Sequence, residues 1–135
     1  MESVYQNYKD RANFLFVYVS EAHPSDGWQM DINEEQKVVY EQPTTKSRRD
    51  EIAQSCCERL KLTMPCVVDT IDNAVDELYA GWPERMFIIG TDGRIAYAGG
   101  PGPFGFHVEE VESWLKRHAP ERGRSVSAET ASITH

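Results

Sequence analysis

The chain has 135 residues, enough for one domain with a core of its own. Its 14 basic and 22 acidic side chains give a net charge of −8, which argues against nucleic acid or anionic lipid as a partner, since both require clustered Lys and Arg. No apolar run approaches the roughly 20 residues of a membrane span, and we expect no signal peptide and no membrane association. Three cysteines predict no disulfide framework and favour a reducing, cytoplasmic location.

The first half of the chain alternates between helical and strand-like patterns. Apolar residues at helical spacing predict a helix within residues 4–12, and the continuous apolar run 14–19 predicts a strand buried on both faces. Residues 20–47 are polar and irregular, and a second helix is expected over 47–61, capped by Ser47. The inner stripe of that helix is expected to be Ile52, Cys56 and Leu60.

The middle of the chain repeats this alternation. Residues 66–69 are predicted to form a short buried strand. A helix is expected to follow through residue 80, with Asp72 as its cap. The residues expected to face inward from that helix are Val75, Leu78 and Tyr79.

The last part of the chain predicts a hairpin and a helix. Residues 85–89 and 94–97 read as strands, and the Asp-Gly pair at 92–93 supplies the positive φ that a tight turn needs. Apolar residues at helical spacing predict a final helix over 108–118. Residues 119–135 have too few large apolar side chains to form a core and are expected to be a disordered tail.

The element order α-β-α-β-α-β-β-α predicts one α/β domain over residues 1–118. We expect a mostly parallel sheet with a C-terminal β-hairpin and flanking helices, which is the thioredoxin-like arrangement with its first, active-site strand missing. That strand would lie between the strands at 14–19 and 85–89. Without it we expect a gap there, a non-native closure of the two strands, or a second copy of the chain filling the space as a homodimer.

Four segments together resemble the iodothyronine deiodinase family, and its bacterial members most. They are Tyr-Val-Ser-Glu-Ala-His-Pro-Ser-Asp-Gly-Trp at 18–28, Pro-Cys-Val-Val-Asp-Thr-Ile-Asp-Asn at 65–73, Tyr-Ala-Gly-Trp-Pro-Glu-Arg at 79–85 and Gly-Gly-Pro-Gly-Pro-Phe-Gly-Phe at 99–106. The similarity covers residues 4–118, and the part from Glu21 to Trp28 is the most specific.

The resemblance implies a thioredoxin-like, selenocysteine-dependent reductive dehalogenase. In this family a selenolate attacks the iodine of thyroid hormones, and a thiol cosubstrate regenerates the enzyme. The reactive selenocysteine or cysteine would precede Met1, so the 135-residue chain is expected to be inactive alone. Two explanations stay open: a gene start misplaced after a selenocysteine codon read as stop, or a truncated paralogue. No bound cofactor is expected.

The resemblance also assigns roles to site residues. His23 matches the proton-handling histidine, Glu84 the glutamate of a proton relay, and Pro83 a cis-proline whose backbone faces the reactive atom. The alternatives are a loop histidine satisfied by Asp26 and a surface Glu84 paired with Arg85. The remaining pocket residues are expected to be Glu21, Ser25, Asp26 and Trp28.

The three cysteines form no Cys-x-x-Cys motif, which predicts no resident dithiol. Cys56 is expected in the core and Cys57 beside it, more exposed, while Cys66 is the one candidate for an auxiliary thiol. The histidines outside the motif have no metal-ligand spacing, so no metal is assigned. A basic cluster at 46–49, which includes Arg49, reads as a solvated helix start.

The sequence departs from the family pattern at the positions expected to bind the substrate. The positions expected to grip the hormone fall on Pro43 and Pro101, whose side chains cannot bind a carboxylate or phenol. We therefore expect a small halogenated aromatic or other reducible small molecule, with a thiol donor. The alternatives are a peroxiredoxin-like peroxide reductase and a catalytically inactive thioredoxin-like binding fragment.

Overall fold

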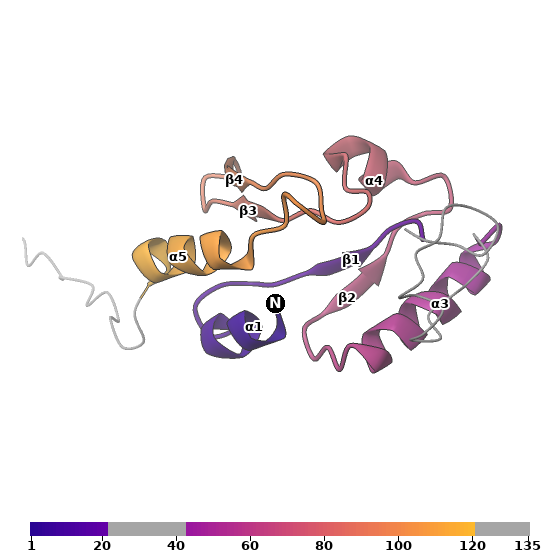
Figure 1. Cartoon of the computed structure of the whole chain (residues 1–135), viewed down its shortest axis with the longest axis horizontal. Helices are drawn as coiled ribbons and strands as arrows, with labels where there is room; N and C mark the ends of the chain where they lie inside the picture. The colour runs from indigo at the N-terminus through magenta and orange to yellow at the C-terminus, as the bar shows by residue number, and fades with distance from the viewer. Residues whose placement is uncertain (22–42, 121–135) are drawn as a thin grey trace, which may run out of the picture.

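The computed structural model describes residues 1–21 and 43–120. Within them the predicted order of helices and strands is confirmed (Figure 1). The predicted tail lies almost wholly outside the described residues, so the domain limits stay a prediction. The elements are α1 (Glu2–Tyr8), β1 (Phe16–Tyr18), α3 (Lys46–Arg59), β2 (Cys66–Val68), α4 (Ala74–Tyr79), β3 (Phe87–Ile89), β4 (Ile95–Ala98) and α5 (Val108–His118).

The described strands form two small sheets in a mixed α/β fold. β1 and β2 run parallel, in register from Phe16 opposite Cys66 to Tyr18 opposite Val68. β3 and β4 form an antiparallel hairpin, with an irregularity at Ile88–Ile89 and Gly93 at φ 79° in its turn, as the Asp-Gly pair predicted. The single, mostly parallel sheet expected from the sequence is not formed by the described strands.

In the small parallel sheet, β1 has a second edge that is directed away from β2. The N–H of Phe16 donates to Pro65 and the carbonyl of Tyr18 accepts from Asp69, so both residues bond toward β2. Because alternate residues of a strand direct their backbone groups to opposite edges, the N–H of Val17 points away from β2. Among the described strands, β2 is the one neighbour of β1.

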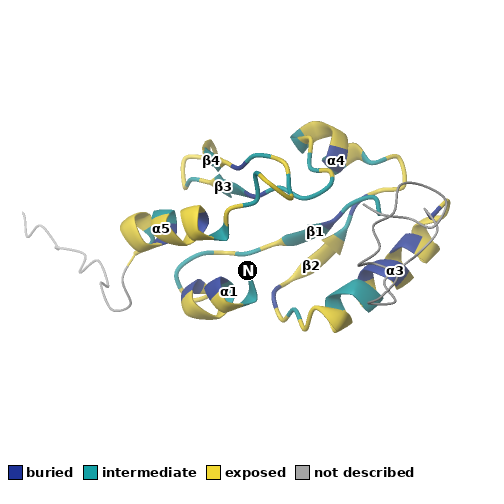
Figure 2. Ribbon diagram, viewed as in Figure 1, coloured by how far each residue is buried: buried dark blue, intermediate teal, exposed yellow. Residues whose placement is uncertain are grey.

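Two separate clusters of buried side chains hold the two halves of the fold (Figure 2). One lies between β1 and α3 and consists of Tyr18, Ile52 and Ala53. The other joins α1 and α5 to the start of the hairpin and consists of Val4, Tyr8, Met86, Val111 and Leu115. The predicted last helix, 108–118, is confirmed at both ends, and its apolar stripe faces this second cluster.

Two strand predictions are wrong in extent and burial. The run 14–19 was expected to be a strand buried on both faces, but β1 covers only Phe16–Tyr18 and Leu15 is 61% exposed. The strand at 66–69 was expected to be buried, but Cys66 and Val67 are exposed. The physical reason is that burial on both faces requires a packed layer on each side of the sheet, and the buried cluster described at these strands packs one helix, α3, against β1.

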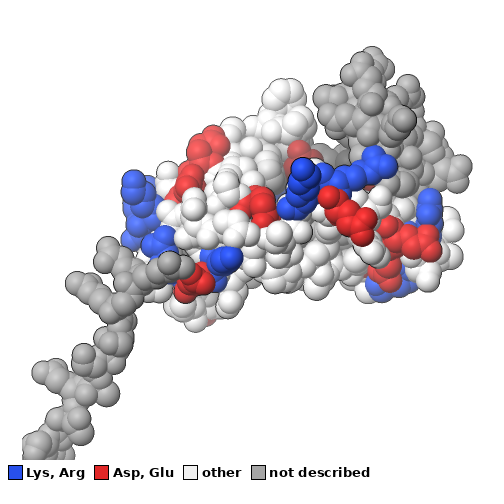
Figure 3. Space-filling view, turned by 90° about the horizontal axis from the view of Figure 1, so that it is seen from below, with Lys and Arg blue, Asp and Glu red and all other residues white. Residues whose placement is uncertain are grey.

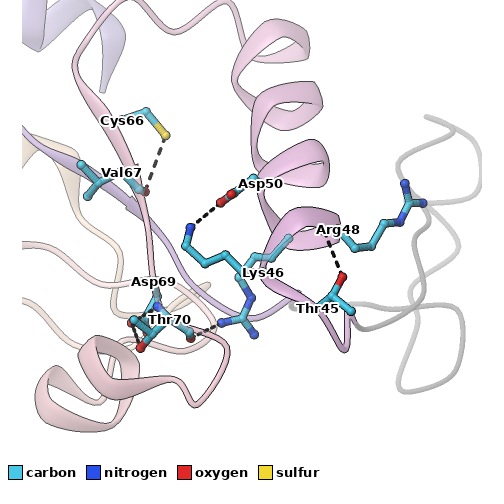
Figure 4. A network of polar contacts seen from close by, with 9 residues as sticks. Thr45, Lys46, Arg48, Asp50, Cys66, Val67, Asp69 and Thr70 are labelled. Carbon is cyan, nitrogen blue, oxygen red and sulfur yellow. Dashed lines mark hydrogen bonds and ion pairs between the residues drawn. The ribbon is translucent and has the colours of Figure 1, made fainter.

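Three details of the helices also differ from the prediction. The cap of α3 is Thr45, whose side-chain oxygen accepts the N–H of Arg48 at 3.2 Å, and not Ser47 (Figure 4). Leu60 follows the end of α3 and is exposed rather than part of an inner stripe. Leu78, expected to face inward, is 80% exposed, because the six-residue helix α4 buries Asp76 instead.

Arg49 was predicted to be a solvated residue, and that prediction is wrong. Its side chain is 1% exposed, and its guanidinium donates to the backbone carbonyl of Thr70 at 2.5 Å and to Oδ1 of Asn73 at 2.8 Å. Its neighbours on α3 form only exposed i,i+3 and i,i+4 ion pairs, and the face in Figure 3 shows charges of both signs interspersed. Arg49 thus ties α3 to the loop between β2 and α4.

Asp69, directly after β2, caps α4 in place of the predicted Asp72. Its carboxylate is 2% exposed and accepts the backbone N–H groups of Thr70, Val75 and Asp76 at 2.8–3.0 Å. Burial alone would raise the pKa of this carboxyl, but the hydrogen bonds from Asp76, Val75 and Thr70 outweigh it and hold the pKa below its usual value. The ionised form of Asp69 therefore stabilises the fold.

We predict that Asp69→Ala lowers the free energy of unfolding by about 1–3 kcal/mol, because three backbone donors lose their acceptor. Urea denaturation at neutral pH measures this loss. The matched control is Asp72→Ala, which removes an exposed carboxylate and should change stability by less than about 0.5 kcal/mol.

The same assignment has a pH consequence. Because the pKa of Asp69 is lowered on folding, its contribution is complete above the unfolded value of about 3.9 and is lost as pH falls through the folded value. The difference in stability between wild type and Asp69→Ala should therefore shrink in acid. An equal loss in Asp72→Ala, or a difference independent of pH below 4, would contradict the assignment.

Candidate functional site

One buried carboxylate joins the two segments in which the sequence predicts site residues. Asp76 of α4 accepts the hydroxyl of Ser20 at 3.2 Å through Oδ2 and the backbone N–H of Trp82 at 2.8 Å through Oδ1. Ser20 follows β1 and leads into the predicted pocket segment 21–28, and Trp82 leads into Pro83 and Glu84. The residues that precede the two segments, Ser20 and Trp82, are therefore both hydrogen-bonded to the same side chain.

The position of Asp76 follows from the way the chain turns around α4. Its own N–H donates to Asp69 at 2.8 Å, which anchors the helix to the end of β2. After Tyr79 the chain reverses through Ala80 at φ 48°, and the N–H of Gly81 returns to the carbonyl of Asp76 at 3.0 Å. This reversal brings the N–H of Trp82 onto the Asp76 carboxylate.

The Trp82–Pro83 peptide is cis, as the resemblance implied. Glu84, which follows, is half-buried, and its carbonyl accepts the N–H of Gly102 at 2.8 Å. The Glu84 side chain lies so close to Gly102 that a methyl group there would overlap its carboxyl group. Gly102 therefore provides the space in which the Glu84 carboxyl lies.

The alternative ion pair between Glu84 and Arg85 is not what the structure shows. The guanidinium of Arg85 donates to the carbonyl of Gly99 at 2.9 Å and to that of Ala80 at 3.3 Å. Arg85 thus ties the segment before β3 to the end of β4. The relay role of Glu84 stays a prediction.

Glu21, the first predicted pocket residue, is held at the end of β1. Its Oε2 accepts the hydroxyl of Tyr18 at 2.7 Å. Burial, and then the hydrogen bond and charge of Glu21, raise the pKa of Tyr18 above its usual value, so its hydroxyl remains a donor.

Burial, and then Cys57 and Glu21, raise the pKa of the nearby Cys56 to about 11, which keeps that thiol protonated at neutral pH.

Four of the predicted site residues lie outside the described residues: His23, Ser25, Asp26 and Trp28. The proposed pairing of His23 with Glu84, and the alternative of His23 satisfied by Asp26, are therefore both still predictions. Asp76 fixes only where the segment that carries them begins.

Cys66, the predicted auxiliary thiol, lies at the start of β2, whereas Asp69 follows the end of that strand. The sulfur of Cys66 lies 3.2 Å from the sulfur of Cys57 on α3. The absence of Cys-x-x-Cys in the sequence therefore did not exclude a thiol pair, because the turn between α3 and β2 brings together cysteines nine positions apart.

One depression on the described surface lies away from the predicted site residues. This open depression of about 340 Å³ lies between β4 and α5, next to Tyr97, Trp114 and Arg117. Across residues 1–21 and 43–120, no three His, Cys, Asp or Glu side chains gather as metal ligands would. The helices described there are all too short or too polar to cross a membrane.

Comparison with known proteins gives a match to the family model described as iodothyronine deiodinase, over residues 2–119. The chain belongs to the iodothyronine deiodinase family. It is 33% identical to thyroxine 5-deiodinase of Sparus aurata over 96% of the chain, and 34% identical to human type II iodothyronine deiodinase over 88%. It covers 46% and 44% of those two proteins, so the chain spans less than half the length of the curated relatives it matches.

Sequence reasoning missed the residues that position the site of this family member. Asp69 carried a usable signal, because an acidic residue just before a short helix can accept that helix's free N–H groups. Asp76 carried none, because its contacts with Ser20 and Trp82 depend on how distant parts of the chain meet. Gly102 carried no such signal, since its role depends on Glu84, which lies far from it in the sequence.

We predict that Asp76→Ala loosens the segment that enters the cis-proline. The N–H of Trp82 loses its acceptor, so its amide should exchange with deuterium at least about tenfold faster, which corresponds to about 1.4 kcal/mol of local stability. Asp76→Asn is the matched control, because its amide oxygen still accepts that N–H while its NH₂ group faces Ser20. Unchanged protection of Trp82 in Asp76→Ala would refute the positioning role.

Proposed function

We propose that the full-length protein is a thiol-dependent oxidoreductase that removes halogen from an aromatic substrate by reduction, as its family name implies. The observation that carries the proposal is that Asp76 holds together the entrances to the pocket segment and to the Pro83–Glu84 segment. The net reaction is balanced by two thiols: an aryl iodide and two RSH give the dehalogenated arene, the disulfide RSSR and hydrogen iodide.

In this proposal each site residue has a distinct task. His23 donates the proton that replaces iodine on the ring carbon, and Glu84 relays protons to it. The backbone at Pro83 forms the wall opposite the reactive atom. The side chains of Glu21, Ser25, Asp26 and Trp28 shape the pocket, and Cys66 is proposed as an auxiliary thiol.

The reactive atom itself is proposed to come from residues that precede Met1. A selenocysteine or cysteine there would be ionised near neutral pH and act as the nucleophile. We propose a thioredoxin-like arrangement in which a strand from that region lies between β1 and β3. The outward N–H of Val17 supports this placement, because it would meet the added strand.

The proposed substrate is a small halogenated phenol or related aromatic. The relatives are named for thyroxine and iodothyronine, which supports an iodinated phenol as the chemical class. Pro43 and Pro101 stand where the family is expected to contact the hormone, and proline has no side-chain donor for a carboxylate or phenolate. We therefore propose a substrate smaller than the hormone, with a low-molecular-weight thiol as donor and a cytoplasmic location.

We predict that His23→Ala and Glu84→Gln each lower turnover about 10²–10⁴-fold in the full-length protein, the range for a lost general acid or base. The assay is dithiothreitol-driven release of iodide from an iodinated phenol. The thermal midpoints of both variants should stay close to wild type, because neither change removes a packed apolar side chain.

The controls separate this activity from its alternatives. Glu109→Gln replaces an exposed carboxylate of α5 and should leave turnover unchanged. Gly102→Ala should reproduce the loss seen in Glu84→Gln, because the added methyl displaces that carboxyl group. Reduction of hydrogen peroxide without iodide release would replace the proposal by a peroxide reductase, and neither activity in the full-length protein would favour a binding module.

A further inference from the structure

Two cysteine thiols from different elements meet on the side of the small parallel sheet that faces α3. Cys57 lies in the last turn and a half of α3, and Cys66 is the first residue of β2. Their sulfurs are 3.2 Å apart, with the thiol of Cys57 donating to the sulfur of Cys66. The thiol of Cys66 in turn donates to the carbonyl of Val67 (Figure 4).

The turn between α3 and β2 is what brings these thiols together. Lys61 adopts φ 51°, and the N–H of Leu62 returns to the carbonyl of Cys57 at 3.0 Å, so the chain reverses at Lys61, directly after α3. At the other end of the turn, Pro65 accepts the N–H of Phe16, which fixes Cys66 at the edge of β1. The contact between the sulfurs is therefore built by hydrogen-bonded backbone on both sides.

We propose that Cys57 and Cys66 are a redox-active dithiol, oxidised to an intramolecular disulfide by exchange with a small disulfide such as oxidised glutathione. This inference shares Cys66 with the proposed dehalogenase function, but its test requires no dehalogenase activity. The thiolate of Cys66 attacks one sulfur of RSSR, which forms a mixed disulfide and releases RS⁻. The thiolate of Cys57 then attacks the Cys66 sulfur and releases a second RS⁻. The two protons lost by the cysteines convert both leaving groups to RSH.

Exposure and connectivity select this pair from the three cysteines. Cys66 is exposed, so an external disulfide reaches its sulfur, whereas Cys56 is half-buried against the cluster of Tyr18 and Ile52. Cys56 and Cys57 are adjacent in a helix, where their side chains point in different directions. Cys57 therefore has Cys66 as its partner for a disulfide.

The exchange should be slow at neutral pH and accelerate in base. Burial of the sulfur, and then the hydrogen bond with Cys57, raise the pKa of Cys66 to about 12. Because the thiolate is the attacking species, the rate should rise about tenfold for each pH unit below that value. At neutral pH the pair would therefore change slowly between the dithiol and the disulfide, and would not turn over rapidly.

The test uses the 135-residue chain, incubated with oxidised glutathione and analysed by mass spectrometry after trypsin. We expect the monomer to lose two hydrogen atoms and to yield a cross-link between the peptide that ends at Arg59 and the peptide that begins at Leu62. Cys56→Ala is the matched control and should form the same cross-link. Cys57→Ser and Cys66→Ser should each stop at a mixed disulfide with glutathione.

A second measurement asks whether the fold, rather than mere closeness in sequence, drives the reaction. The equilibrium constant for closing the disulfide should be at least about tenfold higher in buffer than in concentrated urea, because the folded chain holds the two thiols together and the unfolded chain does not. By thermodynamic linkage, the disulfide then stabilises the folded chain by the same factor. Equal constants, a stable mixed disulfide in wild type, or a cross-link that persists in Cys66→Ser would each overturn the proposal.

Discussion

The arrangement of the candidate site depends on two carboxylates that act in series. Asp69, at the end of β2, accepts the N–H groups of Val75 and Asp76 in the first turn of α4, and the second of these bonds fixes the backbone of Asp76 directly. Asp76 then binds Ser20 and Trp82, which lead into the two site segments. Within the described residues, each carboxylate is buried and accepts hydrogen bonds from uncharged donors, so its loss would leave backbone N–H groups unpaired.

Local patterns predicted the elements whose formation depends on near neighbours in sequence. The last helix and the Asp-Gly hairpin turn follow from side-chain periodicity and backbone φ, and both are confirmed. The predictions that failed concern burial: Leu78 and Leu60 are apolar but exposed, while Arg49 is charged but buried. Burial depends on which segments meet in space, and periodicity does not specify that.

The candidate site shows the same division. The motif around His23 and the Pro-Glu pair at 83–84 are recognisable because residue type and order carry the chemistry. Asp76 and the Cys57–Cys66 contact arise from two chain reversals, at Ala80 and at Lys61, where non-glycine residues adopt positive φ. Alanine and lysine rarely adopt positive φ, so their presence in the sequence does not predict a turn. The residues that these two turns bring together were therefore not predicted.

We propose that a strand from before Met1 completes the fold between β1 and β3. The N–H of Phe87 also points away from its partner, because Met86 bonds to Gly99 across the hairpin. The most direct measurement is deuterium exchange of the Val17 and Phe87 amides, in this chain and in a protein extended toward the N-terminus. The account predicts fast exchange in the first and strong protection of both amides in the second. Equal exchange rates in the two proteins would contradict it.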